Sequence, residues 1–214
     1  MYKRTLTGFT AAALMLGAAS AQAEVDLEQG KQLNNQVCMA CHGPKGISQT
    51  PDWPSHAGQH SDYIVHQMEL FRDQNRWDPQ GLMTENAVGL SDQEIRSVAA
   101  WLEDQTPPGP REVDEELASR GESIYHAGIP EKDVASCASC HGPNGEGVPG
   151  AQFPAVAGQH KPYLSQSLHG FKSEERQSDR NRMMRDTAGR MSEDEIEAVS
   201  AYMASMEHPE AEAE

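Results

Sequence analysis

The sequence predicts an all-α protein built from two tandem copies of one helical unit. The clearest observation is an internal repeat, in which Pro54–His60 matches Pro154–His160 at an offset of 100 residues. A second is the recurrence of apolar residues at helical spacing in each copy. A third is that no alternating run of apolar and polar residues is long enough to form a useful strand.

Residues 1–23 have the pattern of a secretory signal peptide. Lys3 and Arg4 precede an apolar stretch at residues 8–19, and Ala21-Gln22-Ala23 forms an A-x-A cleavage site. A membrane anchor needs about 20 apolar residues, which this stretch does not supply. We therefore expect a mature chain that begins at Glu24 and is exported to the periplasm, without a stable transmembrane anchor.

The rest of the chain divides into a first unit at residues 24–105 and a second at 112–208. Between them, residues 106–111 contain prolines and a glycine that cannot continue a helix or a strand, which predicts a semi-rigid linker. Residues 209–214 form an acidic tail that we expect to be disordered.

In each unit we expect a helix before the cysteine motif, a middle helix, and a last helix that begins at a capping box. The first helices are expected at 26–37 and 112–126, the middle helices at 61–75 and 161–176, and the last helices after Ser91 and Ser192. Along the last helix of the first unit, Ile95, Val98 and Leu102 share one face, which predicts a core position for that face.

All four cysteines lie in two copies of the pattern C-x-x-C-H, at Cys38–His42 and Cys137–His141. Disulfides, a thioredoxin-like redox pair or half of a zinc site would explain the cysteines alone. None of them explains the histidine, and a redox pair would need a βαβ context that the chain lacks. C-x-x-C-H is the signature of covalent haem attachment. We therefore predict two c-type haems, attached at Cys38, Cys41, Cys137 and Cys140, with His42 and His141 as iron ligands.

The second axial ligand decides whether a haem protein carries electrons or binds a substrate. The repeat aligns Met83 with Met184, and both are expected on a loop before the last helix, from which a thioether could reach the iron. We predict these two methionines as the sixth ligands, with Met183 as the alternative in the second unit. His60 and His160 are also aligned by the repeat and leave bis-histidine ligation open.

The formal net charge of −16 becomes −18 when the leader, with its two basic residues and no acidic one, is removed. This acidity argues against nucleic acid as a partner and favours basic partner surfaces or adaptation to a salty medium. Locally, residues 172–190 hold six basic and four acidic side chains, and Arg182 and Arg185 nearly flank Met184. That excess predicts a higher reduction potential for the second haem, unless these arginines pair with propionates or neighbouring acids.

Each unit combines C-x-x-C-H-G-P-x-G, A-G-Q-H-x-x-Y, a later methionine and a helix start like L-S-D-x-E-I. Over nearly all of residues 26–207 this combination resembles the dihaem cytochrome c4 family. The resemblance implies two cytochrome c-like domains related by a pseudo-twofold axis, with Met83 and Met184 as sixth ligands. It also implies an electron carrier, with no catalytic residues, between a quinol–cytochrome c reductase of the bc1 type and a terminal oxidase.

Two other functions remain open at this point. The chain could be a dihaem electron-transfer subunit or acceptor of a sulfur-compound dehydrogenase, whose cytochromes resemble it. A dihaem peroxidase would need an open iron position and an acid–base group, against which the two aligned methionines argue. Peripheral association with a membrane surface is also kept open.

Overall fold

A computed structural model describes residues 24–211 of the chain. The predicted signal peptide, residues 1–23, and the last part of the acidic tail, residues 212–214, lie outside this range. Within the described residues the regular structure is helical, and β pairing is limited to two isolated bridges, Ile129–Val134 and Val148–Phe153. The predicted all-α class is therefore confirmed.

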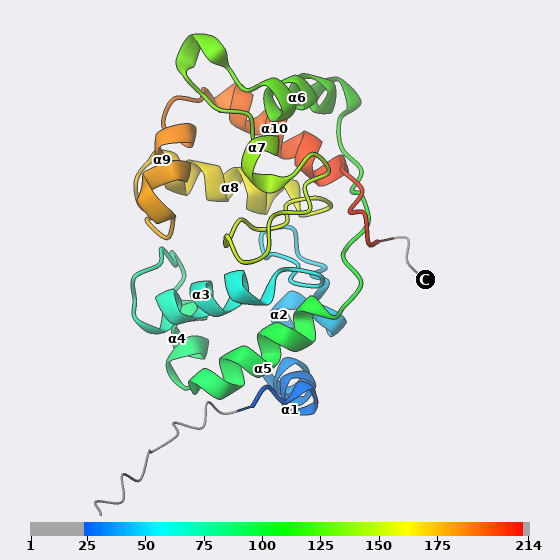
Figure 1. Ribbon diagram of the computed structural model, residues 1–214, viewed down its shortest axis with the longest axis vertical. Coiled ribbons are helices and arrows are strands. Elements are labelled where there is room, and N and C mark those ends of the chain that lie inside the picture. Colours follow the sequence, from blue (N-terminus) through cyan, green and yellow to red (C-terminus); the bar gives the residue numbers. More distant parts are fainter. Residues whose placement is uncertain (1–23, 212–214) are drawn as a thin grey trace, which may run out of the picture.

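Two helical units follow each other along the long axis of the molecule (Figure 1). The helices of the first unit are α1 (Leu27–Leu33), α2 (Met39–His42), α3 (Ser61–Arg72), α4 (Leu82–Val88) and α5 (Asp92–Glu103). Those of the second are α6 (Glu115–Ala127), α7 (Ala138–His141), α8 (Lys161–Lys172), α9 (Met183–Ala188) and α10 (Glu193–Ser205). Among these residues no helix is long and apolar enough to cross a bilayer.

The first and last helices of each unit cross at a glycine. A Cβ atom on Gly30 of α1 would lie 2.1 Å from the carbonyl oxygen of Ser97, and one on Gly121 of α6 would lie 2.0 Å from that of Ala198. Only glycine allows so close an approach. The crossings place the cysteine motif that follows α1 or α6 beside the buried face of α5 or α10.

The predicted capping boxes start both last helices. The hydroxyls of Ser91 and Ser192 accept from the backbone N–H of Glu94 and Glu195, whose carboxylates accept in return from the serine N–H at 2.8 and 2.6 Å. Ile95, Val98 and Leu102 are buried in the core, as predicted from their spacing.

The middle helices end at Arg72 and Lys172, earlier than predicted. In each unit the chain then passes through a left-handed residue, Gln74 or Glu174, at φ values of 57° and 61° that no helix continues. The first helices also differ from the prediction. Helix α1 continues through a π-helical turn, η1 (Asn34–Cys38), directly into α2, whereas α6 begins only after Asp114 caps it and is separated from α7 by residues 128–137.

The linker runs along one side of the molecule and is packed against both units (Figure 1). Pro107 and Pro108 are buried. A Cβ atom on Gly58 would lie 2.3 Å from Pro107, and one on Gly158 would lie 2.4 Å from the carbonyl oxygen of Pro108. The segment therefore fixes the two repeated A-G-Q-H turns against each other.

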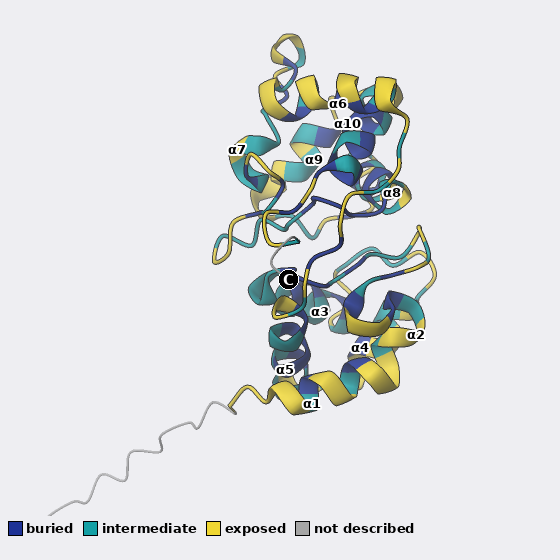
Figure 2. Cartoon of the chain, turned by 90° about the vertical axis from the view of Figure 1, so that its right-hand side faces the viewer, coloured by how far each residue is buried: buried dark blue, intermediate teal, exposed yellow. Residues whose placement is uncertain are grey.

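Hydrogen bonds at the interface come in reciprocal pairs. The Gln59 side chain accepts from the N–H of Ala155 at 3.0 Å and donates to its carbonyl oxygen at 2.9 Å. Gln159 makes the same two bonds with Ser55, at 3.0 and 2.9 Å. This reciprocal exchange fits the pseudo-twofold relation that the resemblance to the cytochrome c4 family implied. Exposed residues instead concentrate on the outer helices α1 and α6 (Figure 2).

Candidate cofactor-binding site

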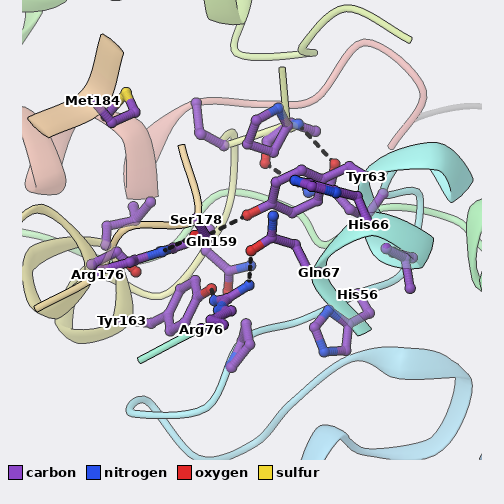
Figure 3. Close-up of a pocket in the computed structure, with 18 of the residues that line it drawn as sticks. His56, Tyr63, His66, Gln67, Arg76, Gln159, Tyr163, Arg176, Ser178 and Met184 are labelled. Atoms are coloured by element: carbon purple, nitrogen blue, oxygen red, sulfur yellow. Dashed lines mark hydrogen bonds between the residues drawn. The ribbon is translucent and has the colours of Figure 1, made fainter. Parts of the chain in front are cut away.

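One cavity of about 390 Å³ lies between the two units and extends into both. Figure 3 shows its central part. Its walls contain every residue predicted to hold a cofactor: Cys38, Cys41, His42, Met83, Cys137, Cys140, His141 and Met184. Residues about 100 positions apart in the sequence therefore line one cavity.

The short helices α2 and α7 hold the cysteine motifs. One helical turn separates the two cysteines of each pair, and the histidine follows at once. Burial raises the pKa of the Cys38 and Cys137 thiols to about 11 before any haem is attached. A thioredoxin-type redox pair needs a lowered thiol pKa, and none of the four cysteines forms a disulfide within residues 24–211. The site does not fit a redox pair.

Both motif histidines are oriented for metal binding. Nδ1 of His42 donates to the carbonyl oxygen of Pro54, and Nδ1 of His141 to that of Pro154, each at 2.9 Å. This bond fixes the ring and leaves Nε2 with the free lone pair. Burial lowers the pKa of both imidazoles, which favours the neutral form that binds metals. Sequence analysis missed the role of the two prolines, although the repeat aligns them.

The two methionines lie on helices, which corrects the expected loop. Met83 and Met184 are each the second residue of a short helix, α4 or α9. Both are half-buried and line the cavity, and Met184 also packs against the core of the second unit. Met183 also lines the cavity, but its side chain is 37% exposed. Of the two neighbours, Met184 is thus the better placed for an internal ligand.

Two aspartates, which sequence analysis missed, hold the start of these methionine helices. A carboxylate oxygen of Asp78 accepts from the N–H of Thr84 at 2.8 Å, and one of Asp179 accepts from the N–H of Arg185 at 3.0 Å. Each aspartate lies five residues before its methionine in the sequence, and that equal spacing is the signal that could have revealed them.

His60 and His160 are engaged at the interface between the units. Nε2 of His60 donates to the carbonyl oxygen of Glu146, and Nε2 of His160 to that of Ser48, each at 2.9 Å. The nitrogen that would coordinate an iron is thereby occupied in both. The two residues have a structural role that accounts for their repetition.

The arginines near Met184 do not provide the free positive charge expected from the sequence. Arg182 pairs with Glu174 at 2.7 Å and with Asp186 at 3.3 Å. Arg185 pairs with the nearly buried Asp179 at 2.7 Å. Both charges are neutralised locally, so the alternative of pairing with neighbouring acids is correct for these two residues. Arg182 and Arg185 therefore do not support the expected higher potential at the second haem.

The residues fit a haem in each unit. Each half of the cavity supplies two thiols one helical turn apart, an oriented neutral imidazole and a methionine thioether. The walls between them include apolar side chains such as Ile64, Leu164 and Phe171. Two helical units with this donor set define a c-type cytochrome with two haems.

Comparison with known proteins agrees with this class. The model of the cytochrome c family matches residues 27–106 and 118–207. Cytochrome c4 from Thiocapsa roseopersicina is 46% identical over 179 residues, which cover 83% of this chain and 91% of the relative. The chain belongs to the dihaem cytochrome c4 family and carries two covalently bound c-type haems, one for each C-x-x-C-H motif.

Solved structures support the same assignment. The crystal structure of reduced recombinant cytochrome c4 from Pseudomonas stutzeri superposes with a TM-score of 0.77 at 32% identity, and covers 86% of this chain and 100% of that one. Thiosulfate dehydrogenase (TsdBA) from Marichromatium purpuratum gives a TM-score of 0.76 at 31% identity, over 85% of this chain and 40% of that one. A thiosulfate dehydrogenase electron acceptor from Stutzerimonas stutzeri is 33% identical over 205 residues, which cover 94% of this chain and 94% of the relative.

Proposed function

We propose that the protein is a periplasmic electron carrier that passes electrons from a bc1-type quinol–cytochrome c reductase to a terminal oxidase. Cys38, Cys41, Cys137 and Cys140 hold the haems through thioether bonds. His42 and Met83 would hold the first iron, and His141 and Met184 the second. The observation that carries this proposal is the presence, in each half of the cavity, of one oriented imidazole and one methionine. Two strong ligands for each iron suit a carrier.

Each haem iron, when bound, supplies one-electron chemistry by alternating between the ferric and ferrous states. The chain keeps the ligands in place during that change. The carbonyl oxygens of Pro54 and Pro154 fix the imidazole rings, and Asp78 and Asp179 fix the helices that carry the methionines. A site held in one geometry needs little rearrangement when the charge of the iron changes.

A spectroscopic comparison of three alanine variants tests the ligands. Met83→Ala and Met184→Ala should each abolish the charge-transfer band between methionine sulfur and ferric iron for one haem only. Met183→Ala is the matched control, because its side chain is adjacent in sequence but partly exposed, and it should keep both bands. An unchanged spectrum in Met184→Ala, or a lost band in Met183→Ala, would reject the assignment for the second haem.

A second candidate function is electron acceptor of a sulfur-compound dehydrogenase. Two relatives favour it by name. They are the thiosulfate dehydrogenase electron acceptors of Stutzerimonas stutzeri and Thiomonas intermedia, which are 33% and 30% identical to this chain. Stopped-flow reduction of the oxidised protein separates the two candidates. A carrier of the respiratory chain should be reduced faster by a bc1-type reductase with quinol than by a thiosulfate dehydrogenase with thiosulfate, and the reverse order would favour the second function.

Export is part of the proposal. Cleavage after Ala23 gives a mature chain that begins at Glu24, and N-terminal sequencing of protein from the periplasmic fraction tests this. Recovery of the uncleaved chain from the membrane fraction would contradict it.

A further inference from the structure

The two methionine helices begin in different ways. In the first unit Gly81 precedes α4 and has a left-handed backbone, with a φ of 72°. The repeat aligns Gly81 with Arg182, which precedes α9 and is also left-handed, with a φ of 62°. Asn181, one residue earlier, has a φ of 52°. This conformation is open to glycine but costs energy for a residue with a Cβ atom, so the start of α9 is strained and that of α4 is not.

The side chain of Arg182 is held by two acids. Its terminal nitrogens donate to the two carboxylate oxygens of Glu174 at 2.7 and 3.3 Å, and its Nε donates to Asp186 at 3.3 Å. Glu174 follows the end of α8 and Asp186 lies in α9, and these two helices pack against each other (Figure 1). We call Glu174, Arg182 and Asp186 the clamp, because they tie the start of α9 to the end of α8.

The first unit has other residues at the clamp positions. The repeat aligns Gln74 with Glu174, Gly81 with Arg182, and Glu85 with Asp186. Gly81 has no side chain that could join its neighbours, and its left-handed backbone is unstrained. The ionic clamp therefore occurs in the unit whose methionine helix begins at a strained residue.

The clamp lies close to a predicted iron ligand and is open to solvent. Arg182 is two residues before Met184, which is half-buried and lines the cavity (Figure 3). Strained backbone persists only where the surrounding structure holds it. The three clamp side chains are 47–56% exposed, so dissolved ions can screen their attraction.

We propose that Arg182 is a positioning residue, whose clamp holds the strained start of α9 and thereby keeps Met184 on the second iron. When the clamp is broken, the second haem opens to small external ligands, whereas the first haem is unaffected. The inference rests on the proposed function, since it needs Met184 as the sixth ligand. An external ligand binds only after the methionine has left, so the rate of ligand entry reports how firmly the clamp holds.

The test is the reaction of imidazole with the oxidised, haem-loaded protein. At saturating imidazole, the loss of each methionine-to-iron charge-transfer band is limited by release of that methionine, and Met83→Ala and Met184→Ala assign the two bands. Arg182→Gln removes the ion pairs but keeps a strained residue at this position. It should speed release of Met184 about three- to tenfold, as expected for the loss of two exposed ion pairs, and leave release of Met83 unchanged.

Two glycine exchanges separate strain from charge. Arg182→Gly removes both the clamp and the need for it, so release of Met184 should stay within about twofold of the unmutated rate. Gly81→Ala is the reciprocal variant, because its Cβ atom meets no atom within 4 Å and adds strain through φ alone. It should speed release of Met83 and leave Met184 unaffected. Glu174→Gln breaks the clamp from the other side and should act like Arg182→Gln if that variant does not fold.

Salt provides a readout without mutation. Raising sodium chloride from about 0.1 M to about 1 M shortens the screening length from about 10 to about 3 Å. Release of Met184 should become faster in the unmutated protein, and this salt effect should disappear in Arg182→Gly.

The outcomes distinguish this inference from the function on which it rests. Unchanged release of Met184 in both Arg182→Gln and Glu174→Gln would overturn the clamp, and so would equally fast release in Arg182→Gly and Arg182→Gln. If the unmutated protein had no methionine charge-transfer band at the second haem, the proposed ligation itself would be contradicted.

Discussion

Replacing Gln159 by alanine should weaken the contact between the two units substantially. Its side chain is 7% exposed and accepts from the N–H of Ser55 at 3.0 Å while it donates to the carbonyl oxygen of Ser55 at 2.9 Å. Ser55 is itself 4% exposed, so solvent has little access to these groups. Alanine would leave the N–H and the carbonyl oxygen of Ser55 without these partners, and it would also remove the acceptor of the His160 N–H.

An unpaired buried polar group costs about 1–3 kcal/mol, and two such groups cost about 2–6 kcal/mol. A water molecule in the space left by the amide would recover part of this cost, so we expect the free energy of unfolding to fall by about 2–4 kcal/mol. Gln59→Ala should have a similar effect through Ala155. Because both glutamines stabilise one interface, the double variant should lose less than the sum of the single losses.

Calorimetric unfolding of the haem-loaded protein measures these losses. Gln177→Ala is the control, because this glutamine is exposed and its amide donates only to the carbonyl oxygen of Glu174. Its effect should stay within about 0.5 kcal/mol. If Gln159→Ala were as stable as this control, the reciprocal hydrogen bonds would not hold the units together.

Two other predictions concern the helices. Gly121→Ala places a Cβ atom 2.0 Å from the carbonyl oxygen of Ala198 and should lower the free energy of unfolding by about 1–3 kcal/mol. Gly89→Ala is the control, because its Cβ atom meets no atom within 4 Å and should be tolerated. Equal melting temperatures of the two variants would contradict the close crossing of α6 and α10. Burial would raise the pKa of Glu195, but hydrogen bonds from Lys132 and Ser192 lower it overall. A depressed carboxyl pKa adds stability above the unfolded pKa, which is lost as the pH falls through the folded pKa. Glu195→Gln should therefore melt lower at neutral pH but lose less stability in acid, and parallel pH profiles would contradict this.

The predicted starts of the two last helices were confirmed. The capping boxes at Ser91 and Ser192 use groups only three residues apart, so the pattern contains the whole interaction. The repeat likewise predicted two copies of one helical unit, because two similar segments fold into similar units, whereas the pseudo-twofold relation was implied by the resemblance to the cytochrome c4 family.

Contacts between distant segments were the part that the sequence did not reveal. From the local sequence we treated Arg185 as a free positive charge, but in the fold it forms an ion pair with Asp179. The repetition of His60 and His160 was compatible with iron ligation, and only the fold shows both rings bonded to the opposite unit. Arg76 and Arg176 are also 100 residues apart in the sequence. Only the fold shows that each donates a hydrogen bond to a tyrosine of the opposite unit.

Exposure of the chemically reduced protein to carbon monoxide tests most directly whether both irons are closed by ligands from the chain. With His42 and Met83 on one iron and His141 and Met184 on the other, the optical spectrum should not change when the gas is added at neutral pH. Rapid formation of a carbon monoxide adduct at either haem would show an open iron position and would contradict the assignment as an electron carrier.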